Sequence, residues 1–384
     1  MEPAFLVQAS GARLGAVSSI SQTGLRQYAA APWWTRRTFD PQKEAKMNYL
    51  SKHKDAILRK GAIIVPLLIL AIFLAIKMPL FYEWENIRNL LVQTSGIAVM
   101  AFGITFVLIS GCIDLSMPAI MWLSATVAAI VMRDTGLGIA GGLLAMLAVS
   151  MLCALINGIA VAKFKMLPFI ATLAMQIVAK GIATLLSKGY AVPIPAAFCE
   201  IGNGRIGPVP VSIIYMILIW IVLHLLLSRT AFGRQVYAIG INGAASENCG
   251  ISLSRMQIKI YLIGGICVFF ASVIISSRLQ SSAPAMAAET APLDIICSAV
   301  LGGVSINGGS GKVFGVLFGA IILMAFQNIL NLFSVDAYTI MMLKGLLIIG
   351  VTSLEAFGRA NEKVKKVQKS KRRHNGTIGG VEQS

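Results

Sequence analysis

Apolar segments follow one another along the chain from residue 61 to residue 356, and no other feature constrains the fold as strongly. A helix that crosses a bilayer needs about 20 predominantly apolar residues. We expect such spans at 61–78, 87–109, 113–132, 137–161, 168–187, 209–228, 257–278, 313–332 and 337–356. A helix satisfies its backbone hydrogen bonds internally, which a hydrocarbon environment requires. The sequence therefore predicts an all-α, polytopic membrane protein.

The composition favours the same class. Of the 384 residues, 57% are hydrophobic and 13% are charged, whereas a soluble domain carries about 25% charged residues. The formal net charge of +17 comes from Lys and Arg residues that lie mainly before residue 61, at 229–259 and after 358. No basic patch interleaved with aromatic residues is present, so the charge indicates contact with membrane lipid and not with nucleic acid.

The cysteine and histidine patterns give no indication of a metal site. The six cysteines show no CxxC spacing, and the three histidines are scattered along the chain. Free cysteines in apolar segments behave as small hydrophobic residues. We therefore expect no metal, no disulfide framework and no cofactor.

A shorter apolar segment at 293–303, followed by a glycine-rich loop, is either a full span or a re-entrant half-helix. Counting it gives about ten helices. The positive-inside rule places the amino end in the cytoplasm, together with Lys163, Lys165, the basic residues of 229–259 and the tail at 363–373. The tail reaches the cytoplasm only if 293–303 crosses fully. This favours a short span and predicts that both termini are cytoplasmic.

The sequence divides into three regions: a cytoplasmic segment at 1–60, a membrane domain at 61–356 and a basic cytoplasmic tail at 357–384. Residues 1–46 contain Arg and Ser and few acidic residues, as an organelle transit peptide does. The alternative is that translation starts at Met47. The basic residues just before position 61 are typical of a bacterial membrane-protein start and favour this alternative.

The stretch 111–116 lies between two apolar segments and carries Asp114 and Ser116. A carboxylate is costly in hydrocarbon, so Asp114 must face protein, water or a partner. Asp114 and Ser116 either line a transport path or gate, or Asp114 caps the following helix, with Met117 and Pro118 in its first turn. Both interpretations can hold together.

A long loop at 230–251 is expected on the cytoplasmic side. Asn242 is a candidate N-cap and Gly250 a candidate helix stop, around a short helix of small residues. Such a loop either docks in the groove of another protein or is a folded linker without a partner.

A glycine-rich loop follows at 302–311, with Gly302, Gly303, Ser305, Gly308, Gly309 and Gly311 as its candidate functional residues. A phosphate-binding loop would need glycine at 306 and Ser or Thr at 313, where Ile306 and Val313 stand instead. The chain therefore shows no ATP site of its own. We expect irregular backbone at or near membrane depth, surrounded by protein or water. Gly311, Gly315 and Gly319 recur at helical spacing, which predicts a smooth face for helix packing.

Single polar residues inside the expected spans are either solute contacts or interhelical hydrogen-bonding groups, the second role being the commoner one. They are Gln93, Asn157, Gln176, Lys180, Gln327, Asn328, Asn331 and Lys344. The candidates for a translocation path are Asp114, Ser116, Asn157, Gln176, Asn328 and Asn331.

Several motifs in the correct order resemble the ribose-type permease family of bacterial ABC importers, over roughly residues 60–356. The family's GGIDLS resembles 111–116, with Cys112 in place of a glycine, and its PFIATLA resembles 168–174. Its cytoplasmic GRxxYAIGGN resembles 233–242, with Ile241 replacing a glycine. Its GGxSxxGGxG matches 302–311 in full, and its NNGLNLL is recognisable at 327–332.

The resemblance implies a permease of the bacterial plasma (inner) membrane that imports a monosaccharide or a related small polar solute. A separate cytoplasmic ABC ATPase would drive transport, and an extracytoplasmic sugar-binding protein would deliver the solute. A second permease subunit, either a second copy or a paralogue, would complete the path. The ATPase-coupling loop would comprise Gly233, Arg234, Tyr237, Gly240, Asn242, Glu247 and Gly250. Pro292 departs from the family, which puts the outer mouth at 283–294 in doubt.

The residues also limit the rival functions. An ion-coupled secondary transporter or a channel is the alternative, with Asp114 as its one acidic candidate, and no inverted repeat is evident. An intramembrane enzyme would need a nucleophile or metal set, and no GxSxG occurs. We therefore expect a transport subunit and not an enzyme.

Overall fold

The structure is a computed structural model that describes residues 79–350 and residue 353. These residues belong to the second of two compact units, Ala62–Ser384. The first unit, Met1–Gly61, lies outside the described residues, as do the expected span at 61–78, most of the end of the expected span at 337–356 and the whole tail at 357–384.

Seven helices in the described part are long and apolar enough to cross a membrane. They are α3 (Trp84–Ile109), α4 (Met117–Asp134), α5 (Gly138–Ala162), α6 (Pro168–Ser187), α8 (Val211–Arg229), α11 (Leu253–Leu279) and α13 (Val313–Leu332). Each corresponds to an expected span, and α6 and α13 match the expected bounds to the residue. α4 begins at Met117 and not at 113, because the chain turns at 110–111 and residues 112–116 have no regular secondary structure. The prediction of a polytopic helical membrane protein is confirmed.

Shorter elements connect these helices. They are η1 (Pro79–Tyr82), α7 (Ala196–Asn203), α9 (Ala231–Ile241), α10 (Gly243–Asn248), η2 (Pro284–Ala287) and α12 (Ala291–Leu301), and an apolar helix follows α13 at Ala337–Gly350. α12 has 11 residues and rises about 16 Å at 1.5 Å per residue, about half of the roughly 30 Å hydrocarbon core.

Four two-residue strands correct the strictly all-α expectation. β1 (Val192–Pro193) pairs antiparallel with β4 (Ser281–Ser282), and β2 (Arg205–Ile206) pairs with β3 (Val209–Pro210). These strands lie in connections between helices, where the backbone has no helical partner and exchanges hydrogen bonds with another connection instead.

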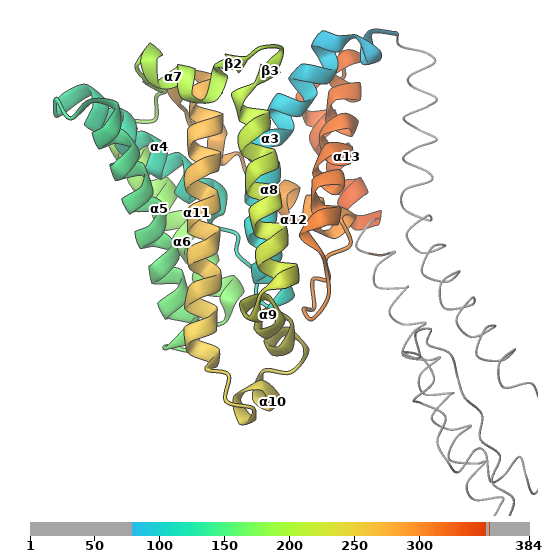
Figure 1. Cartoon of the computed structure of the whole chain (residues 1–384). Coiled ribbons are helices and arrows are strands. Elements are labelled where there is room, and N and C mark those ends of the chain that lie inside the picture. The colour runs from blue at the N-terminus through green and yellow to red at the C-terminus, as the bar shows by residue number, and fades with distance from the viewer. Residues whose placement is uncertain (1–78, 351–352, 354–384) are drawn as a thin grey trace, which may run out of the picture. The chain divides into compact units, whose positions relative to one another are not determined.

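The central helix of the bundle is α3. From Thr94 to Ile109 every residue except Ile97 is buried, and α3 packs on α8, α11, α12 and α13. Figure 1 shows α8 and α11 standing beside it. α5 and α6 lie further out, against α4, and expose large apolar side chains such as Leu144 and Leu185. Exposed leucines on a membrane helix face lipid or a partner helix, since water would disfavour them.

The packing of α12 on α13 depends on two glycines of α13. A Cβ atom at Gly315 would lie 2.1 Å from the Gly302 carbonyl oxygen, and one at Gly319 would lie 2.2 Å from the Ser298 carbonyl oxygen. The two helices therefore meet backbone to backbone. The predicted smooth face is confirmed at Gly315 and Gly319, but not at Gly311, which lies before the start of α13 with a φ of +147°.

This contact predicts a stability effect. Gly319→Ala forces a methyl group against the α12 backbone, and such overpacking costs about 1–3 kcal/mol. We expect a lower thermal unfolding temperature of the detergent-solubilised protein. Gly181→Ala on α6 is the matched control, because its Cβ would meet nothing within 4 Å. Equal unfolding temperatures for the two variants would contradict this packing.

Candidate functional site

Three sequence motifs meet at one end of the bundle. The backbone N–H of Gly309 donates to the carbonyl of Ile109, the last residue of α3, at 2.8 Å. The hydroxyl of Tyr237 on α9 donates to the carbonyl of Gly311 at 2.6 Å. The glycine-rich loop is thereby tied both to α3 and to α9. We call this contact region of Ile109–Gly111, Tyr237–Gly240 and Gly308–Gly311 the glycine junction.

Glycine is required in this junction because the three backbones touch. A Cβ atom at Gly240 would lie 1.8 Å from the Ile109 carbonyl oxygen and 2.7 Å from the Gly309 nitrogen. Gly308, whose φ is +84°, approaches Gly111 so closely that its Cβ would lie 2.9 Å from the Gly111 Cα atom. No larger residue fits at Gly240 without separating α9 from α3.

The remaining residues of the glycine-rich loop close it on itself. The Ser305 N–H donates to the Ser310 carbonyl at 3.0 Å, and Ser305 is buried. At the start of the loop, the backbone of Gly302 touches that of Val316 on α13, and Gly303 turns the chain out of α12 with a φ of +85°. The loop therefore connects α12 and α13 rigidly to the junction.

Short capped helices build the other side of the junction (α9 and α10 in Figure 1). The Thr230 side chain caps α9 by accepting from Gly233 N at 3.2 Å, and Asn242 caps α10 by accepting from Ala245 N at 3.0 Å. Gly250, with a φ of +82°, turns the chain just after α10. The predicted cap at Asn242 and stop at Gly250 are confirmed. Arg234 and Glu247 are exposed, so they are free for contact with another chain.

A buried polar network lies just beyond the junction. Asp114 Oδ1 accepts from the Ser116 N–H at 2.8 Å and from the Ser116 hydroxyl at 2.5 Å, and Asn157 on α5 donates to Ser116 Oγ at 2.8 Å. The exposed fractions are 5% for Asp114, 0% for Ser116 and 1% for Asn157. The network includes Thr172 on α6, whose hydroxyl accepts from Leu115 N at 3.3 Å. It holds the start of α4 against α5 and α6.

Asp114 lies in the connection between α3 and α4, and its burial is the main influence on the pKa of its carboxyl group. Burial raises the pKa of its carboxyl group above the ordinary 3.8, and the two hydrogen bonds from Ser116 oppose this rise. Asp114 does not cap α4 as the capping interpretation expects, because the N-cap residue is Ser116 and no side chain caps the first turn of the helix. Asp114 instead holds Ser116 itself, through its N–H and its hydroxyl. No cationic side chain pairs with it among the described residues.

The other path candidates do not join this network. Asn328 on α13 exchanges two hydrogen bonds of 3.0 Å with Asn86 on α3, near the opposite end of the bundle. Asn331 is exposed and Gln176 on α6 is half-buried. Sequence reasoning singled out neither Asn86 nor Thr172; the only signal was the place of Thr172 inside the motif at 168–174.

A buried ion pair joins α12 to the last described helix. Lys344 Nζ lies 2.9 Å from Asp294 Oδ2, and both side chains are less than 10% exposed. Lys344 stood among the polar residues expected inside spans. Its partner comes from α12 and could not be read from the sequence, because 50 residues separate the two.

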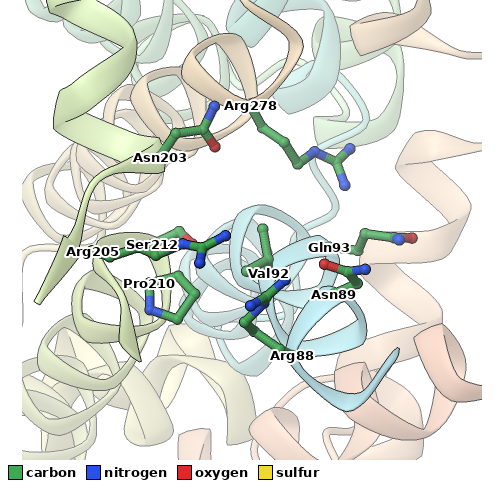
Figure 2. A pocket seen from close by; sticks show the side chains of 9 residues that line it. All are labelled: Arg88, Asn89, Val92, Gln93, Asn203, Arg205, Pro210, Ser212 and Arg278. Carbon is green, nitrogen blue, oxygen red and sulfur yellow. The ribbon is translucent and has the colours of Figure 1, made fainter. Parts of the chain in front are cut away.

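A pocket of about 230 Å³ lies at the end of the bundle opposite the glycine junction. α3, α8 and α11 all reach it with the ends that are remote from the junction. Figure 2 shows the guanidinium groups of Arg88, Arg205 and Arg278 around the pocket. The other lining residues are Asn89, Val92, Gln93, Asn203, Pro210 and Ser212. Sequence reasoning named Gln93 alone among them, since the cations lie on three separate elements.

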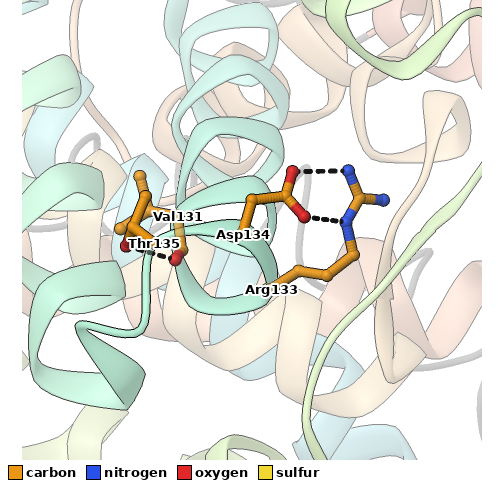
Figure 3. Close-up of polar contacts among 4 residues, drawn as sticks. All are labelled: Val131, Arg133, Asp134 and Thr135. Atoms are coloured by element: carbon orange, nitrogen blue, oxygen red, sulfur yellow. Dashed lines mark hydrogen bonds and ion pairs between the residues drawn. The ribbon is translucent and has the colours of Figure 1, made fainter.

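The same end of the bundle carries a charge pair outside the pocket. Arg133 and Asp134, at the end of α4, form two contacts of 2.7 and 2.8 Å (Figure 3). Thr135 donates to the Val131 carbonyl at 2.7 Å and closes the last turn. Both charged side chains are exposed, so the pair contributes little to stability.

The glycine junction predicts that Gly240 tolerates no side chain. Gly240→Ala places a methyl group on the Ile109 carbonyl, so we expect loss of monodisperse protein or a clearly lower unfolding temperature in size-exclusion and thermal measurements. Gly243→Ala is the control, since its Cβ would make ordinary contacts of 3.6 and 3.7 Å with Leu253. An unaffected Gly240→Ala protein would refute this junction.

Asp114 predicts a pH effect. Its raised pKa means that ionisation disfavours the folded state, so its contribution to stability is lost as pH rises from 3.8 through the raised pKa. Asn at this position stays neutral and keeps an oxygen acceptor for Ser116. We expect Asp114→Asn to unfold at a higher temperature than wild type at about pH 8, with the difference shrinking toward about pH 4. A wild type that gains stability relative to the variant as pH rises would contradict this assignment.

Comparison with known proteins gives consistent matches. The sequence model of the family described as "Branched-chain amino acid transport system / permease component" matches residues 86–352. The ribose import permease protein of Bacillus subtilis (strain 168) is 37% identical over 308 residues, which cover 77% of this chain and 92% of that protein. The ribose import permease protein of Haemophilus influenzae is 35% identical over 74% of this chain and 89% of its own length.

The L-arabinose ABC transporter permease protein of Azospirillum brasilense is 31% identical over 81% of this chain and 91% of its own length. No solved structure gives a significant match. The resemblance to ribose-type permeases is confirmed. The chain therefore belongs to the branched-chain amino acid transport system / permease component family, as a multi-pass inner-membrane permease of the ABC importer type.

Proposed function

We propose that the chain is the membrane-spanning subunit of an ATP-driven importer for a monosaccharide or a related small polar solute. The relatives are permeases for ribose and L-arabinose by name, which supports the substrate class. The observation that carries the mechanism is the glycine junction, where α9, which leads directly into the exposed α10, contacts two parts of the bundle.

In this proposal α9 and α10 couple the permease to a separate cytoplasmic ATPase. Closure of the ATPase on ATP would displace α10 and α9 as a rigid body. α9 would transmit the displacement to α3 through the contact of Gly240 with Ile109. The bond from Tyr237 to Gly311 would transmit it to α12 and α13. The contact of Gly240 with Ile109 suits this role because no side chain lies between α9 and α3 at that point.

The same end of the bundle would face the cytoplasm. It carries Lys163 and Lys165 after α5, and the bond from Ser254 to the Ala162 carbonyl keeps them beside the start of α11, near Arg255 and Lys259. Cationic connections favour the cytoplasmic side. The pocket then opens on the extracytoplasmic side, and both termini are cytoplasmic if the chain has an even number of crossings.

The path of the chain from α11 to α13 supports a full crossing at 293–303 instead of a re-entrant loop. The chain leaves α11 at the pocket end and reaches the glycine junction at Gly308. α12 covers about half of this path, and β4, η2 and the glycine-rich loop cover the rest. Irregular backbone of this kind is tolerated where protein surrounds it, and Ser282, Met286 and Ala287 are buried. With 61–78 and 337–356 as further spans, the count becomes ten.

The remaining partners are proposed from the family. An extracytoplasmic binding protein would deliver the solute, and a second permease, either a copy of this chain or a paralogue, would complete the path. No observation favours the alternative of an ion-coupled transporter or a channel. Its acidic candidate, Asp114, is buried and hydrogen-bonded within the protein.

The coupling role predicts charge-dependent capture of the ATPase. The chain and the ATPase encoded beside it are co-expressed, and co-purification in detergent is measured. We expect Glu247→Arg, on the exposed surface of α10, to reduce capture at least about tenfold, equivalent to about 1.4 kcal/mol. Glu200→Arg is the control, because Glu200 is equally exposed but lies on α7 at the pocket end.

A substitution at Gly240 is unsuitable for this test, since it would disturb the fold itself. No capture by wild type, together with solute uptake by the purified protein alone in an ion gradient, would refute the importer proposal. Equal loss in the two Glu→Arg variants would refute α10 as the docking element.

A further inference from the structure

The pocket opposite the glycine junction has an excess of positive charge. Three of its nine lining residues are arginines and none is acidic. Arg88 has a partner in Glu85 at 3.1 Å, but Arg205 and Arg278 form no ion pair with any residue of 79–350. Guanidinium groups stay charged at every physiological pH, so their mutual repulsion persists unless an anion enters.

The uncharged lining adds a second observation. Ser212 is 1% exposed, and its hydroxyl has no hydrogen-bond partner among the described residues. A buried polar group without a partner is costly, which points to a ligand atom or a water that completes it. Asn89, Gln93 and Asn203 contribute amide groups, and the Asn203 amide is held in place by its bond to the Ser277 carbonyl at 2.8 Å.

We propose that this pocket binds a solute that carries a carboxylate beside several hydroxyl groups, in other words a sugar acid. Arginine binds carboxylate through two parallel hydrogen bonds, for which Arg205 and Arg278 are free. Amide and hydroxyl side chains suit sugar hydroxyls, because they both donate and accept. The volume of about 230 Å³ is below that of pockets for drug-sized ligands, about 300–1,000 Å³, and suits a single sugar ring.

This inference deepens the proposed function, on which it rests for the side of the membrane that the pocket faces. α3 carries Gln93 at the pocket and Ile109 at the glycine junction, about 24 Å apart along the helix. A solute in the pocket therefore contacts the same helix that the coupling helices contact. The site would select an anionic solute at the entrance, in contrast to the sugars named for the relatives.

The test compares two probes that differ in one group. Glucuronate and glucose share a pyranose ring, and only glucuronate has a carboxylate. Binding of each to the purified permease is measured by calorimetry in detergent without phospholipid, which removes lipid headgroups as a competing anion. We expect saturable binding of glucuronate and at least about tenfold weaker binding of glucose, because glucose lacks a charge-assisted bond to arginine.

Variants assign the binding to the pocket. Arg278→Gln and Arg205→Gln should each weaken glucuronate binding at least about tenfold, and Arg278→Lys should recover part of it because the charge remains. Arg133→Gln is the matched control and should bind as wild type. It removes the same charge at the same end of the bundle, from a side chain whose partner is Asp134 and not the pocket (Figure 3).

The same carboxylate could come from an acidic side chain of the binding protein. If glucuronate does not bind, but the binding protein is captured by wild type and released by Arg278→Gln and Arg205→Gln, the sugar-acid inference is overturned and the arginines hold an acidic side chain of the binding protein instead. If the arginine variants change neither glucuronate binding nor capture of the binding protein, while they still capture the ATPase, the inference is overturned and the proposed function stands. No capture of the ATPase by wild type, together with solute uptake by the permease alone in an ion gradient, would refute the proposed function separately.

Discussion

The close approach of three backbones at the glycine junction is the constraint on which the rest of the structure depends. Non-helical backbone in a membrane protein must find its hydrogen bonds within the protein. Here the carbonyl at the end of α3 accepts from the glycine-rich loop, and the same carbonyl excludes any side chain at Gly240. The Ile109 carbonyl therefore joins the loop between α12 and α13 to the end of the central helix and also fixes how closely α9 approaches it. A change at Gly111, Gly240 or Gly308 would therefore affect α3, α9 and the glycine-rich loop together.

Buried polar pairs hold the outer helices to this centre. Asp114 and Ser116 fix the start of α4 against Asn157 of α5, and the ion pair of Asp294 with Lys344 ties α12 to the last described helix. A charge inside a membrane bundle is tolerated when it is paired, and breaking such a pair is costly. These contacts also separate two kinds of polar residue. The network near Asp114 is satisfied within the protein, whereas the arginines of the pocket have unused donors.

Much of the fold could be predicted from the sequence, because hydrocarbon imposes a simple rule on length and polarity. α6 begins at Pro168 and α13 begins just after Lys312, and these are the positions where the two apolar runs begin. The cap at Asn242 and the stop at Gly250 could be predicted because capping is local. The sequence predicts the fold less well where the chain is proposed to cross the membrane without a long helix. The segment at 281–301 combines a strand, a 3₁₀ turn and a short helix, and apolar length alone does not distinguish a full crossing from a re-entrant loop.

The sequence by itself determined the class of the protein, the places of most spans and the motifs that mark its family, since each depends on residues close together in the chain. Only the tertiary structure decided which of these motifs touch. Gly111, Gly240 and Gly308 are each unremarkable alone, and their contact exists because α3, α9 and the glycine-rich loop end at the same level of the bundle. The arginine pocket likewise gathers Arg88, Arg205 and Arg278 from three elements. Both sites depend on how helices pack, and packing depends on surfaces that are assembled from residues far apart in sequence.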